Sequence, residues 1–408
     1  MNKKKIINDP VYGFISIPTD LIFDLIEHPY FQRLRYIKQL GMTHLVYPGA
    51  LHTRFHHAIG AMHLMGMAVE TLRNKGHAIS DDEEEAVIIA ILLHDVGHGP
   101  FSHALEEMIV ESISHEDISS MLMNKLNLQF GGRLTMAIDI FTGTYTREFL
   151  HQLVSSQLDM DRLDYLNRDS FFTGVSEGVI SSDRIIKMLN VKDDQIVVEE
   201  KGIYSVEKFL IARRLMYWQV YLHKTVIAGE QLLAKILKRS RELVAMGETV
   251  FTTPALTHFL EKPISRESFI NEEHHLEIFA TLDDTDIMAA VKVWASHPDF
   301  VLAKLCRDLV GRKLYKVEIT NEPPDDQLLL DLTNRAIKKH GITAHEASYF
   351  VFKDTIRNNA YNSGDGDIQI LMKNGSAKNI TAASDNSNLE ALAKTVKKHI
   401  LCFGKELI

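Results

Sequence analysis

The sequence predicts a mainly α-helical protein that ends in a small α+β domain. Apolar residues recur at helical spacing from about residue 21 to residue 308, as in helices that bury one face. After about residue 312 the chain changes to short alternating stretches rich in β-branched and aromatic residues. The 408 residues are 45% hydrophobic, which suits a large core and two or three domains. We expect a helical domain at 1–311 and an α+β domain at 312–408.

Several segments of the helical domain show the helical period clearly. They cover residues 21–40, 57–73, 82–95, 209–244 and 286–295. Residues 195–199 alternate instead and precede Lys201 and Gly202, which predicts a small β-hairpin.

The C-terminal domain is expected to follow the order strand, helix, strand, strand, helix. Gly341 ends the first of these helices, because glycine is favoured directly after a helix. The predicted strands are 314–319, 348–352 and 367–372, and the predicted helices are 326–340 and 388–401.

Composition excludes several classes of protein. No apolar stretch is long enough to span a membrane, and the basic N-terminus leads into Asp9 and Pro10 rather than into the apolar part of a signal peptide. The only cysteines, Cys306 and Cys402, predict a reducing compartment, the cytoplasm, without a disulfide framework. A net charge of −9 argues against general nucleic-acid binding.

The most informative segment joins an apolar run to a histidine–aspartate pair. Residues 87–93 are all apolar and are followed by His94 and Asp95, after which glycines and a proline within 97–100 stop the helix. A carboxylate beside an imidazole at the edge of a core is costly unless a charged group pairs with it. A divalent cation is the expected partner, since both side chains are good metal ligands.

Two neighbouring segments complete a metal-ligand set. A histidine–aspartate pair occurs by chance about once in a chain with 20 histidines, so the pair alone is weak. Residues 53–60 and 157–165 add further ligand types. One divalent metal, Mn, Fe, Zn, Ni or Mg, would be held by His57, His94, Asp95 and Asp161, with room for water and a substrate oxygen. The alternative is that these four are ordinary surface or capped core residues.

These motifs also carry a family resemblance. The chain resembles the HD-domain phosphohydrolases, and within them it is similar to the deoxynucleoside triphosphate triphosphohydrolases, especially the vertebrate type that joins a SAM domain to the HD domain. The resembling segments cover slightly more than half the chain and include 8–10, 31–41, 47–50, 53–57, 94–103 and 221–224. The resemblance implies a helical HD-domain core and hydrolysis of a deoxynucleoside triphosphate to deoxynucleoside and triphosphate.

Candidate residues for catalysis follow from residue type and from the resemblance. Histidine exchanges protons near neutral pH, so His98, His103 and His115 suit proton transfer to and from water and the leaving oxygen, with Glu106 as an acidic partner. The resemblance implies that His103 acts with Glu106 and His115. For His115 the alternative is a capping role in a polar turn.

A triphosphate needs more positive charge than one metal supplies. By motif, Arg54, Arg162 and Arg213 are the candidates for phosphate contacts, with Tyr165 as a hydroxyl donor. Each arginine alone is more often a solvated surface residue. The resemblance further implies that Gln39 and Asp169 hold the 3′-hydroxyl of the sugar and that Leu40 crowds a 2′-hydroxyl, while Tyr221 lies near the sugar or the base.

The N-terminal match implies a second nucleotide site and an assembly. In the vertebrate enzymes the corresponding positions bind an activating guanine nucleotide between subunits; here they are Lys5, Ile6, Glu27, Gln32 and Arg35. The alternative is that Gln32 and Arg35 only pack and pair on a helix. We therefore expect a homo-oligomer, at least a dimer.

Two other functions remain open on the sequence alone. An HD phosphohydrolase could act on another phosphoester, such as a nucleoside monophosphate, although three candidate arginines favour a longer phosphate chain. A nucleotide-sensing or nucleic-acid-binding protein with a vestigial site is the third hypothesis. The complete metal set, with His98, His103 and His115, argues against it.

Overall fold

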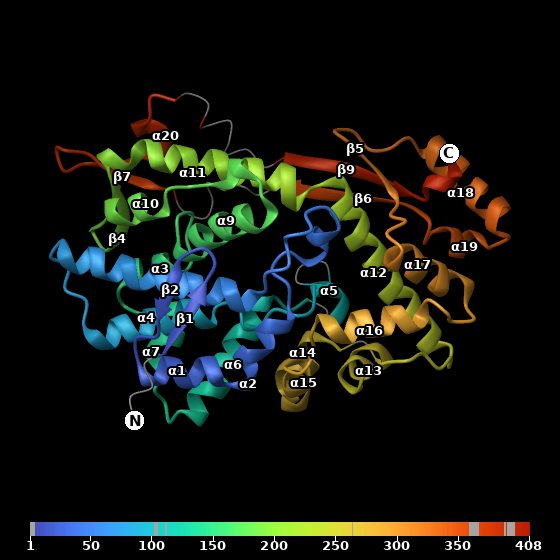
Figure 1. Cartoon of the computed structure of the whole chain (residues 1–408), viewed down its shortest axis with the longest axis horizontal. Helices are drawn as coiled ribbons and strands as arrows, with labels where there is room; N and C mark the ends of the chain where they lie inside the picture. Colours follow the sequence, from blue (N-terminus) through green and yellow to red (C-terminus); the bar gives the residue numbers. More distant parts are fainter. Residues whose placement is uncertain are drawn as a thin grey trace.

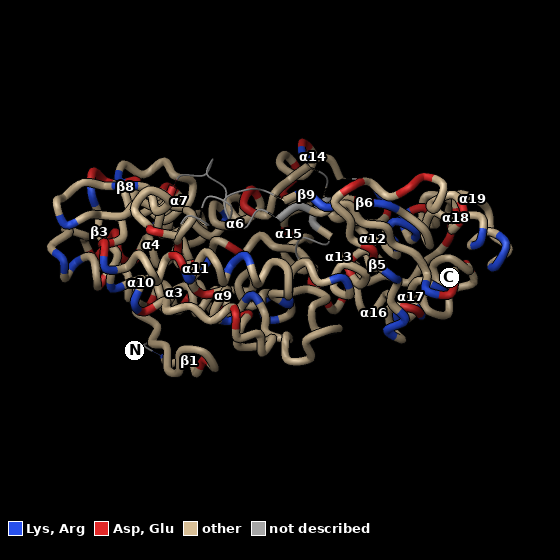
Figure 2. Tube along the Cα trace, turned by 90° about the horizontal axis from the view of Figure 1, so that it is seen from above, with Lys and Arg blue, Asp and Glu red and all other residues tan. Residues whose placement is uncertain are grey.

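The computed structural model describes residues 5–101, 105–110, 112–262, 264–358, 367–386, 389 and 396–408. The molecule is elongated and mainly helical, as the fold class predicts. Two small sheets lie near its upper edge in Figure 1, and the N-terminal hairpin lies lower, among the helices. Lys and Arg residues are interspersed with Asp and Glu residues over the molecule (Figure 2). None of the described helices is long and apolar enough to cross a membrane.

Three helices position the histidines and aspartates of interest. Helix α3 (Arg54–Asn74) packs against both α4 (Asp81–Leu93) and α9 (Met160–Thr173). Helix α4 begins with a capping box between Ser80 and Glu83, and its apolar residues are buried on every face. Helix α9 begins at the capping carboxylate of Asp159 and ends at Gly174, whose φ of 74° suits glycine.

Two predicted helical segments are interrupted. The segment 21–40 is divided into α1 (Asp20–Glu27), α2 (Pro29–Gln32) and 3₁₀ turns, because the residue before Pro29 takes an extended conformation. The segment 209–244 is divided into α11 (Ile203–Met216), a π-helical turn and α12 (Lys224–Ala245), which is capped by the imidazole of His223.

The remaining α-helices cover these parts. They are α5 (Glu106–Ile109), α6 (His115–Gln129), α7 (Thr135–Phe141), α8 (Glu148–Val154), α10 (Ser182–Met188), α13 (Pro254–Glu261), α14 (Arg266–Asn271), α15 (Glu273–Phe279), α16 (Asp284–Trp294), α17 (Phe300–Val310), α18 (Asp326–His340), α19 (Ala344–Ala347) and α20 (Ile380–Ala383).

The described strands form three small sheets. An N-terminal hairpin pairs β1 (Ile6–Asp9) with β2 (Gly13–Ser16). The predicted hairpin around 195–199 is confirmed, and its sheet has the order β3 (Leu189–Lys192), β4 (Gln195–Glu199), β7 (Gln369–Leu371) and β8 (Ala377–Asn379). The third sheet has the order β5 (Lys316–Thr320), β9 (Val396–Phe403) and β6 (Val351–Asn358).

The predicted closing helix at 388–401 is wrong over residues 396–401, although residue 389 is helical as predicted. Residues 396–403 form strand β9, whereas 387–388 and 390–395 lie outside the described residues. Strand β9 is central and antiparallel to both β5 and β6, so both edges of its backbone are hydrogen-bonded and its last four residues are buried. That pairing outweighs the helical spacing of its side chains.

The segment after residue 312 is shared between two sheets. Strand β7 pairs in parallel with β4 of the helical region, while β5, β6 and β9 form a sheet of their own. The predicted helix at 326–340 is confirmed as α18, with Gly341 at a φ of 66°. Buried apolar residues from both sides of residue 312 belong to one continuous core. The domain boundary itself stays a prediction.

Candidate active site

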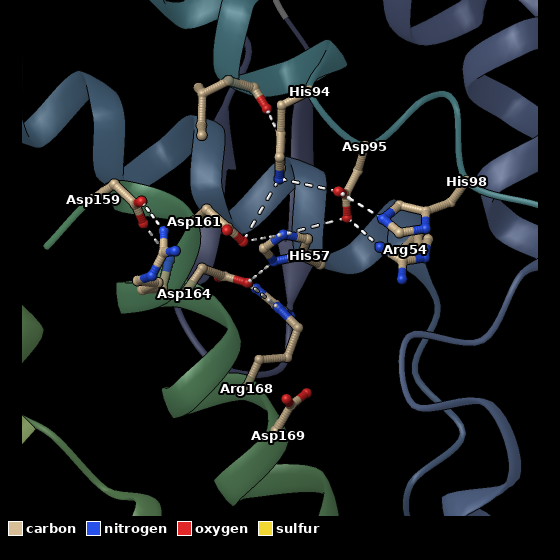
Figure 3. Close-up of polar contacts among 12 residues, drawn as sticks. Arg54, His57, His94, Asp95, His98, Asp159, Asp161, Asp164, Arg168 and Asp169 are labelled. Carbon is tan, nitrogen blue, oxygen red and sulfur yellow. Dashed lines mark hydrogen bonds and ion pairs between the residues drawn. The ribbon is translucent and has the colours of Figure 1, made fainter. Parts of the chain in front are cut away.

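Two imidazoles and two carboxylates meet where α3, the end of α4 and the start of α9 come together (Figure 3). His57 lies in the first turn of α3, His94 and Asp95 follow α4, and Asp161 lies in the first turn of α9. Asp161 Oδ1 is 3.1 Å from His57 Nε2 and 3.6 Å from His94 Nε2. Asp95 lies 3.3 Å from His94 Nε2 through Oδ1 and 3.7 Å from His57 Nε2 through Oδ2.

The outer nitrogen of each imidazole is held by a partner that orients the ring. His57 Nδ1 contacts Asp164 Oδ2 at 2.7 Å, and His94 Nδ1 donates to the carbonyl of Ile91 at 2.6 Å. When its only proton is on Nδ1, each ring presents the lone pair of Nε2 to the shared centre, and a bound cation would favour this form by displacing the second proton. Both Nε2 atoms are buried and make no hydrogen bond of good geometry among the described residues. This is the orientation that metal-binding histidines adopt.

A buried ion-pair network supports His57 from behind. Arg168 donates to Asp164 from Nε and Nη2 at 2.9 Å each, and its Nη1 reaches Asp9 Oδ2 at 2.8 Å. Gly60 on α3 leaves the space for this pair, because a Cβ there would lie 2.0 Å from Asp164 Oδ1 and from Arg168 Nη2. The hairpin β1–β2 is thereby tied to the rear of the candidate site.

The charges of the cluster suit a divalent cation. Burial lowers the pKa of His57, but Asp161 and Asp164 outweigh it and raise the pKa to about 10. Burial raises the pKa of Asp161, but His57 and His94 lower it far more, so this carboxyl is ionised. Two nitrogen and two carboxylate ligands fit Mn, Fe, Zn or Ni better than Mg, which prefers oxygen. These residues therefore could hold a metal ion.

His98 and His115 lie directly beside this cluster. His98 Nε2 is 3.2 Å from Asp95 Oδ1, and its ring stacks on that of His115 with centroids 3.8 Å apart. Burial and the nearby Arg54 hold the pKa of His98 well below its ordinary value. His103 lies outside the described residues, as does the side chain of Glu106, of which only the backbone in α5 is described.

Gly97 allows the loop with His98 to lie close to helix α6. A Cβ on Gly97 would be 2.3 Å from the His115 carbonyl oxygen and from the Ser119 nitrogen. Ser119 Oγ accepts from the Gly97 nitrogen at 2.9 Å and donates to the His94 carbonyl at 2.6 Å. This contact places His98 and His115 next to each other.

The adjoining face of α9 carries a second polar strip. This strip begins with Arg162, directly after Asp161. It continues three residues later with Tyr165 and four residues after that with Asp169, so the three side chains share one side of the helix. Asp159 forms an ion pair with Arg162, while the Tyr165 and Tyr221 rings lie 6.3 Å apart. The strip thus starts beside the metal-ligand cluster and runs along α9.

The far end of the strip is a small hydrogen-bonded group. Asp169 accepts from the Tyr221 hydroxyl at 2.8 Å through Oδ2 and contacts His52 Nε2 at 2.8 Å through Oδ1. The Gln39 nitrogen donates to the His52 carbonyl at 3.0 Å, and Gln39 Oε1 is buried without a partner among the described residues. Leu40 is half-buried against the core.

The two other predicted phosphate ligands are held near the cluster and near α9. Arg54 forms an ion pair with Asp95, and Arg213 Nη1 donates to Gln157 Oε1 at 3.0 Å. Both guanidinium groups are buried, which is rare for arginine unless it has a polar partner.

The predicted activator residues lie on the surface around α1 and α2. Gln32 Oε1 accepts from Arg35 Nε at 2.8 Å, and the Arg35 guanidinium lies 3.5 Å above the Phe55 ring. Lys5 Nζ lies 4.4 Å above the Phe23 ring, while Ile6 and Glu27 are exposed. These contacts match the alternative of packing and pairing, and nucleotide binding there stays a prediction.

Sequence reasoning missed the residues behind the cluster. Asp164, Arg168, Asp9 and His52 are all buried and connect the ligands to the fold. The available pattern was the spacing on α9: Asp164 lies three residues after Asp161 and Arg168 lies four after Asp164, so all three share one helix face.

Comparisons with known proteins agree with this architecture. Residues 54–166 match the HD domain and residues 180–253 match the HD associated region. The uncharacterized protein YwfO of Bacillus subtilis is 32% identical, with alignment over 100% of this chain and 94% of that protein. The human deoxynucleoside triphosphate triphosphohydrolase SAMHD1 is 29% identical over 54% of this chain and 42% of that protein.

A solved structure covers nearly the whole chain. The crystal structure of a phosphohydrolase from Bacteroides thetaiotaomicron is 54% identical, covers 98% of this chain and 99% of that chain, and superposes with a TM-score of 0.95. The chain therefore belongs to the HD-domain family of metal-dependent phosphohydrolases, and within it resembles the SAMHD1-type enzymes.

Proposed function

We propose that the protein hydrolyses deoxynucleoside triphosphates to deoxynucleoside and triphosphate. The observation that carries this proposal is the polar strip on α9. It starts beside the ligand cluster with Arg162, continues with Tyr165 and ends at Asp169, which is bonded to Tyr221. Such a strip suits a phosphate chain near the cluster and a sugar at the far end.

The metal would be held by His57, His94, Asp95 and Asp161. When bound, a divalent cation neutralises charge on phosphoryl oxygens and lowers the pKa of water. Asp164 and the Ile91 carbonyl keep the two imidazoles in the ligating orientation.

The reaction requires attack of water on the α-phosphorus. The bond from that phosphorus to the 5′ oxygen breaks, the water loses a proton and the leaving 5′ oxygen takes one up. His98 beside Asp95, and His115 stacked on His98, would serve this proton exchange, and the resemblance adds His103 and Glu106. An inactive site would have no reason to keep this arrangement.

The arginines would bind the phosphates of the substrate. An arginine has five N–H donors in a fixed plane, so Arg54 and Arg162 can contact a carboxylate and a phosphate together. Arg213 is buried near the start of α9 through Gln157. These positive charges favour a triphosphate over a monophosphate.

The group around Asp169 would bind the sugar. Gln39 Oε1 is a buried acceptor that the 3′-hydroxyl of a deoxyribose could satisfy. Leu40 would oppose the 2′ face, where a ribose hydroxyl would find no partner. Selection of the deoxy sugar then follows from the cost of burying an unpaired hydroxyl.

The experiment is a product assay with each of the four deoxynucleoside triphosphates and with GTP. Intact triphosphate and deoxynucleoside in equal amounts are expected, with a divalent metal required. Pyrophosphate or inorganic phosphate as the main product would contradict the proposal. Turnover restricted to nucleoside monophosphates would assign the site to the alternative phosphoester reaction.

We also propose a homo-oligomer, at least a dimer, with an activating nucleotide bound near Lys5 and Arg35. The hairpin β1–β2 supports an interface, because Ile6 and Phe14 are 65% and 76% exposed. Light scattering at micromolar concentration, with and without GTP, tests this. A monomer in both conditions would contradict it.

A further inference from the structure

Three histidines come together outside the candidate active site, on helices α13 and α15. His258 lies on α13, and His274 and His275 lie on α15. One ring nitrogen from each lies within 4.8 Å of the other two, and His258 Nε2 is 2.7 Å from His275 Nδ1. In Figure 1 these helices lie in the lower right part of the molecule, away from α4 and α9.

The hydrogen bonds of His275 leave its Nδ1 facing the other histidines. Ser268 Oγ donates its only proton to Glu272 Oε1 at 2.7 Å. Toward His275 Nε2, 2.9 Å away, the Ser268 oxygen therefore acts as the acceptor. Glu272 Oε2 lies 3.6 Å from this Nε2. The proton of His275 is therefore on Nε2, and its Nδ1 accepts the 2.7 Å hydrogen bond from His258 Nε2. A metal ion would displace this His258 proton and bind between the two nitrogens. This carboxylate–histidine arrangement is typical of metal ligands.

Aromatic side chains fix two of the three rings. His258 packs edge-to-face on Phe259, with centroids 5.1 Å apart, and His275 lies parallel to Phe269 at 6.3 Å. Phe259 and Phe269 are fully buried. The rings of His258 and His275 are consequently held in place before any ligand binds, which reduces the conformational entropy lost on binding.

The surroundings favour a cation that can enter from solvent. Glu272 lies 3.9 Å from His274 Nδ1, and the side chain of His274 is 53% exposed. The Glu272 carboxylate therefore attracts a cation on the side where His274 is open to solvent.

We propose that His258, His274 and His275 form a second metal site, specific for late transition ions such as Zn²⁺, Co²⁺, Ni²⁺ or Cu²⁺. Three imidazole nitrogens suit these ions, whereas Mg²⁺ and Ca²⁺ require oxygen ligands. Water completes the coordination, and Glu272 orients the ring of His275 from the side away from the metal. The proposal is independent of the reaction at the candidate active site.

Occupancy of this site would join two helices that are separate in sequence. A metal between His258 and His275 closes the loop that contains α14 and attaches α13 to α15. Closing a loop by a metal restricts the unfolded chain and so stabilises the folded one. The site is therefore structural in its expected effect.

The experiment counts zinc equivalents in chelator-stripped full-length protein, by calorimetry with ZnCl₂ and by elemental analysis after desalting. The wild type is expected to bind two equivalents, the variant His94→Ala one, and the double variant His258→Ala/His274→Ala one. The matched control is His345→Ala, since His345 is an exposed histidine 3.7 Å from a carboxylate but belongs to no such cluster among the described residues.

Milder variants keep the test valid if the double variant folds poorly. His274→Gln changes an exposed side chain, and Glu272→Gln keeps the shape of the residue that supports His275. Each variant should lower the affinity for the second zinc ion about tenfold or more. Two outcomes would overturn the proposal. One is a wild type that binds a single equivalent, lost in His94→Ala; the other is a second equivalent that survives in folded His258→Ala/His274→Ala.

Discussion

Replacing Asp164 by asparagine tests whether the carboxylate behind His57 sets the ligating nitrogen. Asp164 accepts from His57 Nδ1 at 2.7 Å and from two Arg168 nitrogens at 2.9 Å each. Asparagine keeps the size but offers one oxygen, and its amide N–H groups can donate to His57 Nδ1. The imidazole proton would then move to Nε2, the atom that must carry a lone pair.

The magnitude follows from removing the carboxylate that orients the His57 ring. Removing the partner of a metal-binding histidine costs about 10–100-fold in metal affinity, or about 1.4–2.8 kcal/mol. The fold should survive, because Arg168 keeps its hydrogen bond with Asp9 at 2.8 Å. We expect a lower affinity for Mn²⁺ with little loss of secondary structure.

The assay is a calorimetric titration of metal-free protein with MnCl₂, which measures the metal affinity. Circular dichroism of the same samples measures the secondary structure. The matched control is Asp299→Asn, because Asp299 also pairs with an arginine, at 2.6 Å from Arg239, but has no metal-ligand histidine beside it. The control should keep the metal affinity of the wild type. Equal affinities for Asp164→Asn and the wild type would refute the reasoning.

Three further predictions concern the sugar site and a partly buried acid. Leu40→Ala should narrow the preference for dGTP over GTP in kcat/KM, which we expect to be about one to two decades, because it makes room for a 2′-hydroxyl. Gln39→Ala should raise KM for dGTP in the same assay, since the 3′-hydroxyl loses its partner; an unchanged KM would contradict this role. Burial raises the pKa of Glu230 on α12 from 4.5 to about 7, so its contribution to stability is lost as pH rises from about 4.5 to 7, at a cost of about 3 kcal/mol. Glu230→Gln should therefore reduce the drop in thermal midpoint between pH 5 and pH 8. An equal drop in the variant and in the wild type would show that Glu230 does not cause the loss of stability.

The metal-ligand set could be predicted because its chemistry is visible in short motifs. An apolar run that ends in His94 and Asp95 leaves two polar side chains at the edge of a core, and burial makes their partner predictable. The structure brings these two together with His57 and Asp161, as the sequence suggested. Their roles stay proposals until the metal is measured.

Contacts between distant segments could not be predicted in the same way. Strand β9 has a helical side-chain pattern, and only the neighbouring strands β5 and β6 make it a strand. Likewise, His258 and His275 are separated by α14, and no local spacing indicates that their nitrogens meet. Gly60 shows the same limit, because its need for a small side chain depends on the Asp164–Arg168 pair.

Hydrolysis of dGTP in ¹⁸O-labelled water tests the central claim most directly. If water attacks the α-phosphorus at the site of His94 and Asp95, the products are deoxyguanosine without label and intact triphosphate with one ¹⁸O atom at a terminal phosphorus. The variant His94→Ala should yield neither. Release of dGMP with pyrophosphate, label in the deoxyguanosine, or full activity of His94→Ala would contradict the account.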